Sequence, residues 1–470
     1  MTATATTTPR APAAPAHRGL LLGLLCTGLF MVYLDTTVVS VALPAVRADF
    51  GGSVSTLQWV VDAYVLTFAC LLLSAGAIGD LVGRRAVFLT GLVGFTIASA
   101  LCAVSPSVGW LLAARAMQGV FGAALVPVSL ALVVGMYADP AERARAIGAW
   151  AGTGGLALAA GPVLGGLLTQ HFGWASVFWL NVPIGVVVGA ALLKLLPTSP
   201  AITNRRIDVI GQVLFAAGIA SLTWALIEGG SRGWISAPVL SGLVLAVAAL
   251  ALFVIWEARC PTPMLPLDLV RQRVVAAACT ANLLSLSGFY IALFLLTLHL
   301  QSVQHLSAVA TGARFLALTT AVMAASYAAS AVAARIGSRV PAVGGALCAT
   351  IGLLGLTNLQ ASSGYLDYAW SLVLLGGGIS FVGAPATVAL LAAVPPARAG
   401  TASGVANTFR QIGAVLGVAL AGALAGTPPL ASAPDHFVSG MHTAFMVAAG
   451  GTVLGAIAAC GLPGRPRARD

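Results

Sequence analysis

Three charged side chains lie inside long apolar stretches of the first quarter of the chain: Asp35, Asp62 and Arg115. A charge within a membrane costs about 2.5–3.5 kcal/mol on insertion scales, so each of these residues needs a function or a partner. A carboxylate can bind and release a proton, and a guanidinium beside it favours the charged form. The three residues are therefore candidates for coupling proton movement to another process.

The positions of these residues along their stretches place them at a similar depth. At the helical rise per residue, Asp35 lies about 22 Å from the start of its stretch, while Arg115 and Asp62 lie about 9 Å and about 8 Å from the other side. We predict that Asp35 binds the coupling proton and that Arg115 adjusts its proton affinity. The alternative is a static ion pair that fixes helix packing. Asp62 is a second proton site, a counter-charge for cationic substrates, or a hydrated structural residue at the outer rim.

Other chemistries find no support in the sequence. There is no nucleophile–base pattern and no Walker loop, so we predict neither an enzyme nor use of ATP. The seven cysteines show no metal-binding spacing, and most lie in apolar stretches as small hydrophobic residues. We expect no metal and no cofactor, with a proton gradient as the energy source.

The composition indicates that lipid surrounds most of the chain. Of 470 residues, 59% are hydrophobic and 8% are charged, and the mean hydropathy is +0.98. Soluble domains carry about 25% charged residues. The net charge of +10 comes from scattered basic residues rather than a dense patch, which argues against nucleic-acid binding.

The hydropathy pattern predicts an all-α membrane protein with fourteen transmembrane helices. The predicted spans are about 20–43, 57–79, 86–105, 109–134, 146–168, 174–193, 209–227, 236–256, 274–300, 308–333, 340–359, 368–394, 401–425 and 440–462.

The basic residues support this count. With the N-terminus in the cytoplasm, eighteen of the 23 Lys and Arg residues fall inside, and only Arg47 and Arg232 fall outside. This bias follows the positive-inside rule and places both termini in the cytoplasm. The excess of arginine over lysine suggests a bacterial genome rich in G and C.

The spans divide into two six-helix bundles at 19–195 and 274–462, separated by an inserted pair with its linkers at 196–273. Residues 1–18 and 463–470 are expected to be cytoplasmic tails, the first of them disordered. Two six-helix halves around a midplane cavity are a recurrent transporter plan.

The loop after the second span resembles the signature loop of the major facilitator superfamily. It carries Gly76, Asp80, Gly83, Arg84 and Arg85 in the pattern GxLxDrxGRr. Gly83 permits a tight turn, and the charged residues can pair across the loop. The resemblance implies a major facilitator fold in which this loop controls conformational gating.

Two further motifs resemble those of fourteen-helix drug:proton antiporters of the EmrB/QacA type. The first span reads LDTTVVSVALP from Leu34, with Ser40 where asparagine is usual. The fifth span carries the GPxxGG motif of exporters at Gly161, Pro162, Gly165 and Gly166. In this motif, proline and glycine bend a helix and allow close backbone approach, so packing alone is the competing explanation.

Several other residues in or near the spans have weaker assignments. The candidate residues of a substrate cavity are Trp59, Tyr64, Tyr290, Phe294 and Arg410. Arg410 has a structural alternative, in which it binds carbonyl groups at a helix end. We expect Arg314 to snorkel towards the membrane surface, and Glu228, His299 and His442 to be interfacial.

The sequence therefore predicts a monomeric secondary transporter of the bacterial cytoplasmic membrane. It would export amphipathic drugs or an antibiotic in exchange for protons. The alternatives are a proton-coupled symporter for a small metabolite and a non-transporting membrane sensor. The substrate itself, the proton stoichiometry and the role of the inserted pair do not follow from the sequence.

Overall fold

The computed structural model describes residues 17–137, 139–197, 207–395, 398–425 and 434–464. All regular structure within these ranges is helical, and fourteen stretches are long and apolar enough to cross a membrane, which confirms the predicted count. Residues 1–16 of the predicted N-terminal tail lie outside the described ranges, and Arg18 already begins α1. The elements are α1 (Arg18–Phe50), α2 (Val54–Val82), α3 (Arg84–Ala103), α4 (Val108–Met136), α5 (Pro140–Phe172), α6 (Ser176–Trp179), α7 (Asn181–Leu195), α8 (Val209–Arg232), α9 (Ala237–Glu257), α10 (Leu267–Val270), α11 (Arg273–Leu298), the π-helical η1 (His299–Val303), α12 (Ala308–Arg314), α13 (Leu316–Ile336), α14 (Arg339–Leu356), α15 (Tyr365–Ala392), α16 (Ala399–Ala425) and α17 (Pro434–Ala459).

Many helices extend beyond the apolar stretches that predict them. The first apolar stretch predicts an end near Leu43, yet α1 continues through Pro44 to Phe50. The fifth begins at Pro140, after Asp139 accepts a hydrogen bond from the backbone N–H of Glu142. Such ends lie beyond the apolar core and are stabilised by caps rather than by lipid, so hydropathy does not detect them.

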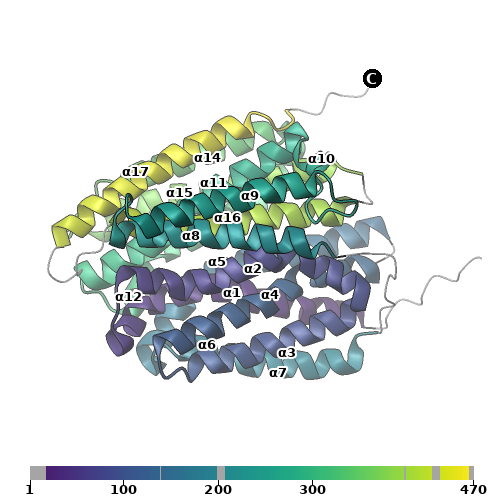
Figure 1. Ribbon diagram of the computed structural model, residues 1–470, viewed down its shortest axis with the longest axis horizontal. Coiled ribbons are helices and arrows are strands. Elements are labelled where there is room, and N and C mark those ends of the chain that lie inside the picture. The colour runs from purple at the N-terminus through teal and green to yellow at the C-terminus, as the bar shows by residue number, and fades with distance from the viewer. Residues whose placement is uncertain (1–16, 138, 198–206, 396–397, 426–433, 465–470) are drawn as a thin grey trace, which may run out of the picture.

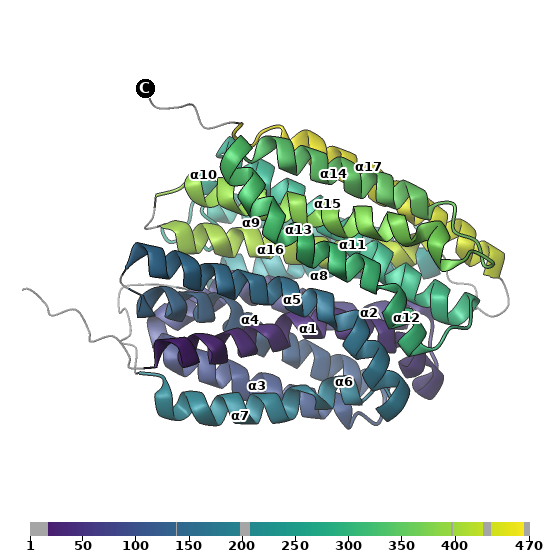
Figure 2. The ribbon, with the colours of Figure 1, turned by 180° about the vertical axis from the view of Figure 1, so that it is seen from behind.

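Two six-helix bundles make up most of the molecule (Figures 1 and 2). In the N-terminal bundle α1 packs on α5, α2 on α4, and α3 on α4 and α7. In the C-terminal bundle α11 packs on α16 and α17, and α15 lies between α13 and α14. Two spans are interrupted, one between α6 and α7 at Leu180 and one between α12 and α13 at Phe315.

The inserted pair, α8 and α9, lies at the seam between the bundles (Figure 1). α8 contacts α2 of the N-terminal bundle and α16 of the C-terminal bundle, whereas α9 packs against α8. Near the end of α8, Gly230 approaches the backbone of Ala423 in α16. α8 is thus a bridge between the bundles as well as a connection along the chain.

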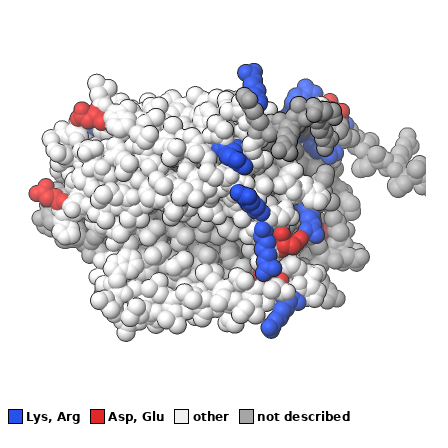
Figure 3. Space-filling model, turned by 90° about the horizontal axis from the view of Figure 1, so that it is seen from above, with Lys and Arg blue, Asp and Glu red and all other residues white. Residues whose placement is uncertain are grey.

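Basic side chains gather at one end of the helices, here called the basic end; it is marked by Arg18, Arg84, Arg143, Lys194 and Arg273 at helix ends. Figure 3 shows the blue side chains of one face gathered towards this end, with acidic residues both among them and at the opposite end. The fourteen spans, counted in chain order, alternate in direction. The first, third and every later odd span start at the basic end.

The bundles approach each other backbone to backbone near the opposite end. There Gly166 of α5 lies against the carbonyl of Ala308, and a Cβ on Gly312 of α12 would lie 2.6 Å from the carbonyl oxygen of Pro162. Nearer the basic end, Gly404 of α16 meets α2 through a side chain, with Leu73 Cδ2 3.5 Å from a Cβ built on the glycine. The closest inter-bundle packing among these glycine contacts is therefore at the opposite end.

Candidate functional site

Asp35 lies at the centre of a buried polar network in the N-terminal bundle. Its Oδ2 accepts a hydrogen bond from Arg115 Nη1, and the two residues form an ion pair with no exposed surface. Its Oδ1 accepts from Gln118 Nε2 at 2.9 Å and from Asn181 Nδ2 at 3.2 Å. The carboxylate is held by α4 and α7 together, and both of its oxygens are occupied.

Arg115 is fixed by more than its carboxylate partner. Its Nε donates to the carbonyl oxygen of Val60 at 3.0 Å, and its Nη1 donates to Gln118 Oε1 at 2.7 Å. The guanidinium carbon lies 4.4 Å from the ring centre of Tyr64 and 5.6 Å from that of Phe178. Such cation–π contacts strengthen as water is excluded. Tyr64, a candidate for the cavity wall, is therefore packed in the network and not open to a cavity.

Ser99, Gln118 and Asn181 complete this network. Ser99 Oγ accepts from Gln118 Nε2 at 2.7 Å and from Asn181 Nδ2 at 3.3 Å. Their functional roles were missed in the sequence. Gln118 lies three residues after Arg115 in α4 and Asn181 begins α7, but nothing in the spacing shows that they meet at one carboxylate.

Asp62 does not join the Asp35 network. The side chain has no exposed surface, and neither carboxylate oxygen has a hydrogen-bond partner within the described residues. The interpretation as a hydrated residue at the outer rim is therefore wrong. One helical turn earlier in α2, Gln58 donates to the carbonyl oxygens of Val418 and Ala419 in α16. Asp62 thus follows a turn of α2 that contacts the other bundle.

A second polar cluster joins the two bundles next to Asp35. Tyr33 of α1 donates from its hydroxyl to Asn407 Oδ1 of α16 at 3.4 Å. Tyr290 of α11 lies near Thr36, and Arg410 of α16 lies close enough to act electrostatically on both tyrosines. Tyr33 lies two residues before Asp35, and Thr36 follows it directly. Sequence reasoning selected Tyr290 and Arg410 but missed Tyr33.

The remaining cavity candidates differ in exposure. Phe294 is fully buried in α11, with 1% of its surface exposed, and Trp59 is half-buried in α2. No described contact brings either side chain into the two polar clusters. A substrate role for them stays a prediction.

The GPxxGG motif of α5 forms two helix contacts at once. Gly161 and Gly165 pack against α1, where a Cβ on Gly165 would lie 2.5 Å from the carbonyl oxygen of Val38. On the adjacent side of the same turns, Gly166 and the carbonyl of Pro162 meet α12 of the other bundle. The motif therefore fixes α5 both to the helix that carries Asp35 and to the C-terminal bundle.

This packing predicts a position-specific effect of one methyl group. We expect Gly165→Ala to destabilise the protein by about 1–3 kcal/mol, because its Cβ would meet backbone that cannot rotate away. Gly152→Ala in the same helix is the matched control, since nothing lies within 4 Å of a Cβ there. Alanine should slightly stabilise that exposed position. Thermal unfolding in detergent measures both; equal melting temperatures would contradict the packing role.

The loop between α2 and α3 is anchored within the N-terminal bundle. Gly83 adopts φ +105, a conformation that favours glycine. Arg84 pairs with Asp80 at 3.0 Å and donates to the carbonyl oxygen of Ala131 in α4 at 3.2 Å. Arg85 donates to the carbonyl oxygen of Leu193 in α7 at 2.6 Å. The start of the motif also packs on α4, because Gly76 faces Pro127.

Residues expected near the membrane edge have defined surroundings. Arg314 Nη1 donates to Gln304 Oε1 at 2.8 Å and to the hydroxyl of Tyr368 at 3.0 Å. His299 is fully buried at the start of η1. Glu228 lies at the end of α8 and pairs with Arg232 at 2.6 Å.

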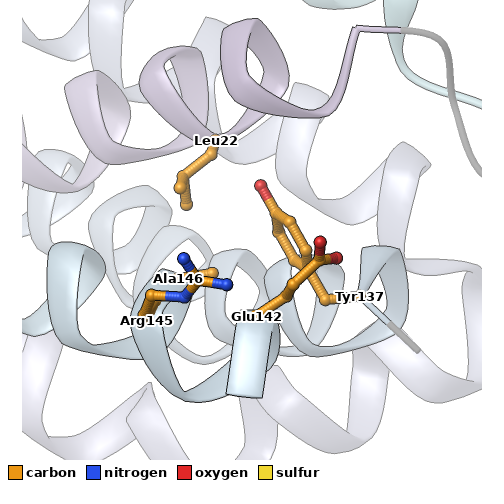
Figure 4. Close-up of a pocket in the computed structure, with 5 residues that line it drawn as sticks. All are labelled: Leu22, Tyr137, Glu142, Arg145 and Ala146. Atoms are coloured by element: carbon orange, nitrogen blue, oxygen red, sulfur yellow. The ribbon is translucent and has the colours of Figure 1, made fainter. Parts of the chain in front are cut away.

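An open hollow of about 290 Å³ lies at the basic end, remote from Asp35 (Figure 4). Leu22 of α1 faces Glu142, Arg145 and Ala146 of α5 across it, with Tyr137 beside them. Arg18 and Glu142 form a loose ion pair at 3.5 Å near its edge. The residues that line this hollow include no member of the two polar clusters.

Comparison with known proteins identifies the family. The family model of the Major Facilitator Superfamily matches residues 25–418. The chain is 37% identical to the multidrug resistance protein Stp of Mycobacterium tuberculosis over 87% of this chain and 76% of that protein. It is 36% identical to the tetracenomycin C resistance and export protein of Streptomyces glaucescens, over 84% and 74% of the two chains.

A solved structure shows the same fold. The chain is similar to a bacterial homologue of the human lysosomal transporter Spinster, with a TM-score of 0.66 and 15% identity. The match covers 94% of this chain and 96% of that one. Fourteen apolar helices, a Gly83–Arg84–Arg85 loop and the match over most of the sequence lead to one conclusion: the chain belongs to the Major Facilitator Superfamily.

Proposed function

We propose that this chain is a secondary active exporter of the bacterial cytoplasmic membrane, which exchanges protons for an amphipathic drug or an antibiotic. The names of its relatives support this proposal: two are described above, and a third, 32% identical over 89% of this chain, is the multidrug efflux pump LfrA of Mycolicibacterium smegmatis. The proton gradient is the energy source. One copy suffices, because both bundles belong to one chain.

The observation that carries the proposal is the buried Asp35–Arg115 pair beside the inter-bundle cluster of Tyr33, Tyr290 and Arg410. A proton that reaches Asp35 neutralises the carboxylate and ends its attraction for Arg115. The guanidinium then keeps only its neutral acceptors and the rings around it, so the α1–α4 contact weakens. Because Tyr33 and Thr36 flank Asp35 on α1, this change reaches the inter-bundle cluster of Tyr33, Tyr290 and Arg410, where a substrate would bind.

The asymmetry of the inter-bundle packing supports alternating access. We infer that the basic end faces the cytoplasm, as the positive-inside rule requires. The backbone contacts of α5 with α12 at the opposite end then close the outer side. Drug would enter from the cytoplasmic side, and protonation at Asp35 would favour the return to this state after release.

Asp62 fits the role of a second proton site. A buried carboxyl without any partner is far less costly as the neutral acid than as an anion. A cationic drug that reached α2 would instead be attracted by the ionised carboxylate of Asp62. Exchange of a proton for a cation at this one carboxylate is the simplest way to link proton binding to drug release.

A susceptibility panel tests the export function. In an efflux-deficient bacterial strain, we expect the wild-type protein to raise the tolerated concentration of at least one amphipathic antibiotic and to lower its accumulation. A proton uncoupler should restore accumulation. Accumulation that stays low when the gradient is collapsed would contradict proton coupling, and drug uptake increased by the protein would favour import.

A further inference from the structure

Two carboxyl groups meet where the inserted pair reaches the basic end. Asp208 precedes α8 and Glu257 ends α9, and only 8% and 3% of their surfaces are exposed. The two side chains lie close enough to interact. A Cβ on Gly211 would lie 2.5 Å from Asp208 Oδ2 and 2.7 Å from Glu257 Oε1, so both oxygens point into the same small space.

This arrangement requires a proton or a cation between the oxygens. Ionised carboxylates only accept hydrogen bonds, and two of them in contact away from water cannot both carry charge without compensation. Asp208 Oδ2 and Glu257 Oε1 have no donor from any other residue that the structure describes. Over the same residues, no ion pair reaches either side chain, and no cluster of three metal-binding side chains forms.

The outer oxygens of the pair hold three segments together. Asp208 Oδ1 accepts from the backbone N–H of Gly211 at 2.8 Å and from Trp256 Nε1 at 2.8 Å. Glu257 Oε2 accepts from the backbone N–H of Leu265 at 3.1 Å. The pair thereby connects the start of α8, the end of α9 and the linker that leads to α10.

These segments contact the N-terminal bundle a few residues from the pair. Gln212, one turn into α8, accepts from Ser74 Oγ of α2 and donates to the carbonyl oxygen of Cys70 at 2.9 Å. In the linker, the sulfur of Met264 lies 3.4 Å from the same Ser74 hydroxyl.

The linker also leads directly to the C-terminal bundle. Asp268 of α10 pairs with Arg398, which directly precedes α16. The guanidinium of Arg398 holds the pKa of Asp268 below its usual value. The carboxyl pair thus lies between the attachments to both bundles.

We propose that Asp208 and Glu257 bind one proton between them, and that this proton fastens the inserted pair to the linker at the basic end. Loss of the proton places two negative charges in contact, separates the carboxylates and frees the Leu265 segment. This proton site is distinct from Asp35 and does not depend on the transport of any substrate. It gives the inserted helices a role as a pH-sensitive attachment between the bundles.

Glu257→Gln tests the proposal, because glutamine reproduces the protonated acid. Its Nε2 replaces Oε1 and donates to Asp208 Oδ2, while its oxygen still accepts from Leu265. The folded wild type holds a proton that the unfolded chain releases near neutral pH, so its stability falls as pH rises. We expect the melting temperature of the full-length protein in detergent to fall more steeply between about pH 5 and about pH 9 for the wild type than for Glu257→Gln.

Asp208→Asn is the reciprocal variant and should flatten the same dependence. Glu228→Gln, at the other end of α8, is the control and should keep the wild-type slope. Infrared spectra at neutral pH should show a protonated carboxyl band in the wild type that Glu257→Gln lacks. Wild-type slopes in both amide variants, or failure of both to fold, would overturn the proposal.

The basic neighbours Arg205 and Arg206 lie outside the described residues and provide the competing explanation. If they neutralise an ionised pair, the double variant Arg205→Gln/Arg206→Gln should change the slope as Glu257→Gln does, and the infrared band should be absent. The shared proton predicts that this double variant keeps the wild-type slope and the band.

Discussion

Protein carrying Asp35→Asn is expected to insert and fold normally but to lose proton-driven drug transport to the level of empty vesicles. Asparagine retains acceptor capacity for Gln118 and Asn181, but it carries no charge and cannot release a proton. It therefore resembles the protonated state permanently. Drug uptake into proteoliposomes under an imposed pH gradient measures the loss, and drug exchange without a gradient should persist.

Asp49→Asn is the matched control, because it makes the same substitution near the far end of the same helix. Asp49 accepts from Trp174 Nε1 at 2.6 Å and has no contact with Arg115. We expect gradient-driven transport to be retained in this variant. Wild-type transport by the Asp35→Asn protein would remove Asp35 from the coupling mechanism and favour the static ion pair.

Removing the cation should have the largest effect on stability. We expect Arg115→Met to destabilise the protein by about 3–5 kcal/mol, because Asp35 is then left as an uncompensated buried charge. The Tyr64 and Phe178 rings lose their cation, and the carbonyl of Val60 loses its donor. Thermal or denaturant unfolding in detergent, together with the yield of folded protein, measures this loss.

The double variant separates charge from packing. Arg115→Met/Asp35→Asn removes both charges, so we expect it to recover a large part of the stability lost by Arg115→Met alone. It should remain inactive in gradient-driven transport. Additive losses of stability in the two single variants would show that the pair contributes through packing alone.

Hydropathy and charge predict the architecture because both act on whole segments. Each span must bury about 20 apolar residues, and the fourteen expected stretches are those that form helices. The breaks at Leu180 and Phe315 escape such averaging, because the single polar residues beside them, Asn181 and Arg314, do not interrupt a long apolar stretch. The helix ends at Phe50 and Pro140 escape it for the opposite reason, since they are polar and stabilised by local caps.

The sequence predicts how deep in the membrane each site residue lies, but not towards which side of its helix the residue points. Depth alone puts Asp35, Arg115 and Asp62 at one level, and the structure joins the first two. Asp62 lies apart from their network. A residue count along a helix does not reveal which neighbour each face of that helix meets. The same limit explains why Ser99 and Asn181, which are ordinary polar residues in apolar segments, were not recognised as partners of Asp35.

Proton release driven by drug binding is the most direct test of proton-coupled export. Purified protein in lightly buffered detergent, with a soluble pH indicator, should release protons when a transported drug is added, because substrate and proton binding oppose each other. The Asp35→Asn protein should bind the drug and release fewer protons. Drug binding by the wild type with no proton release, or with proton uptake, would contradict the exchange mechanism.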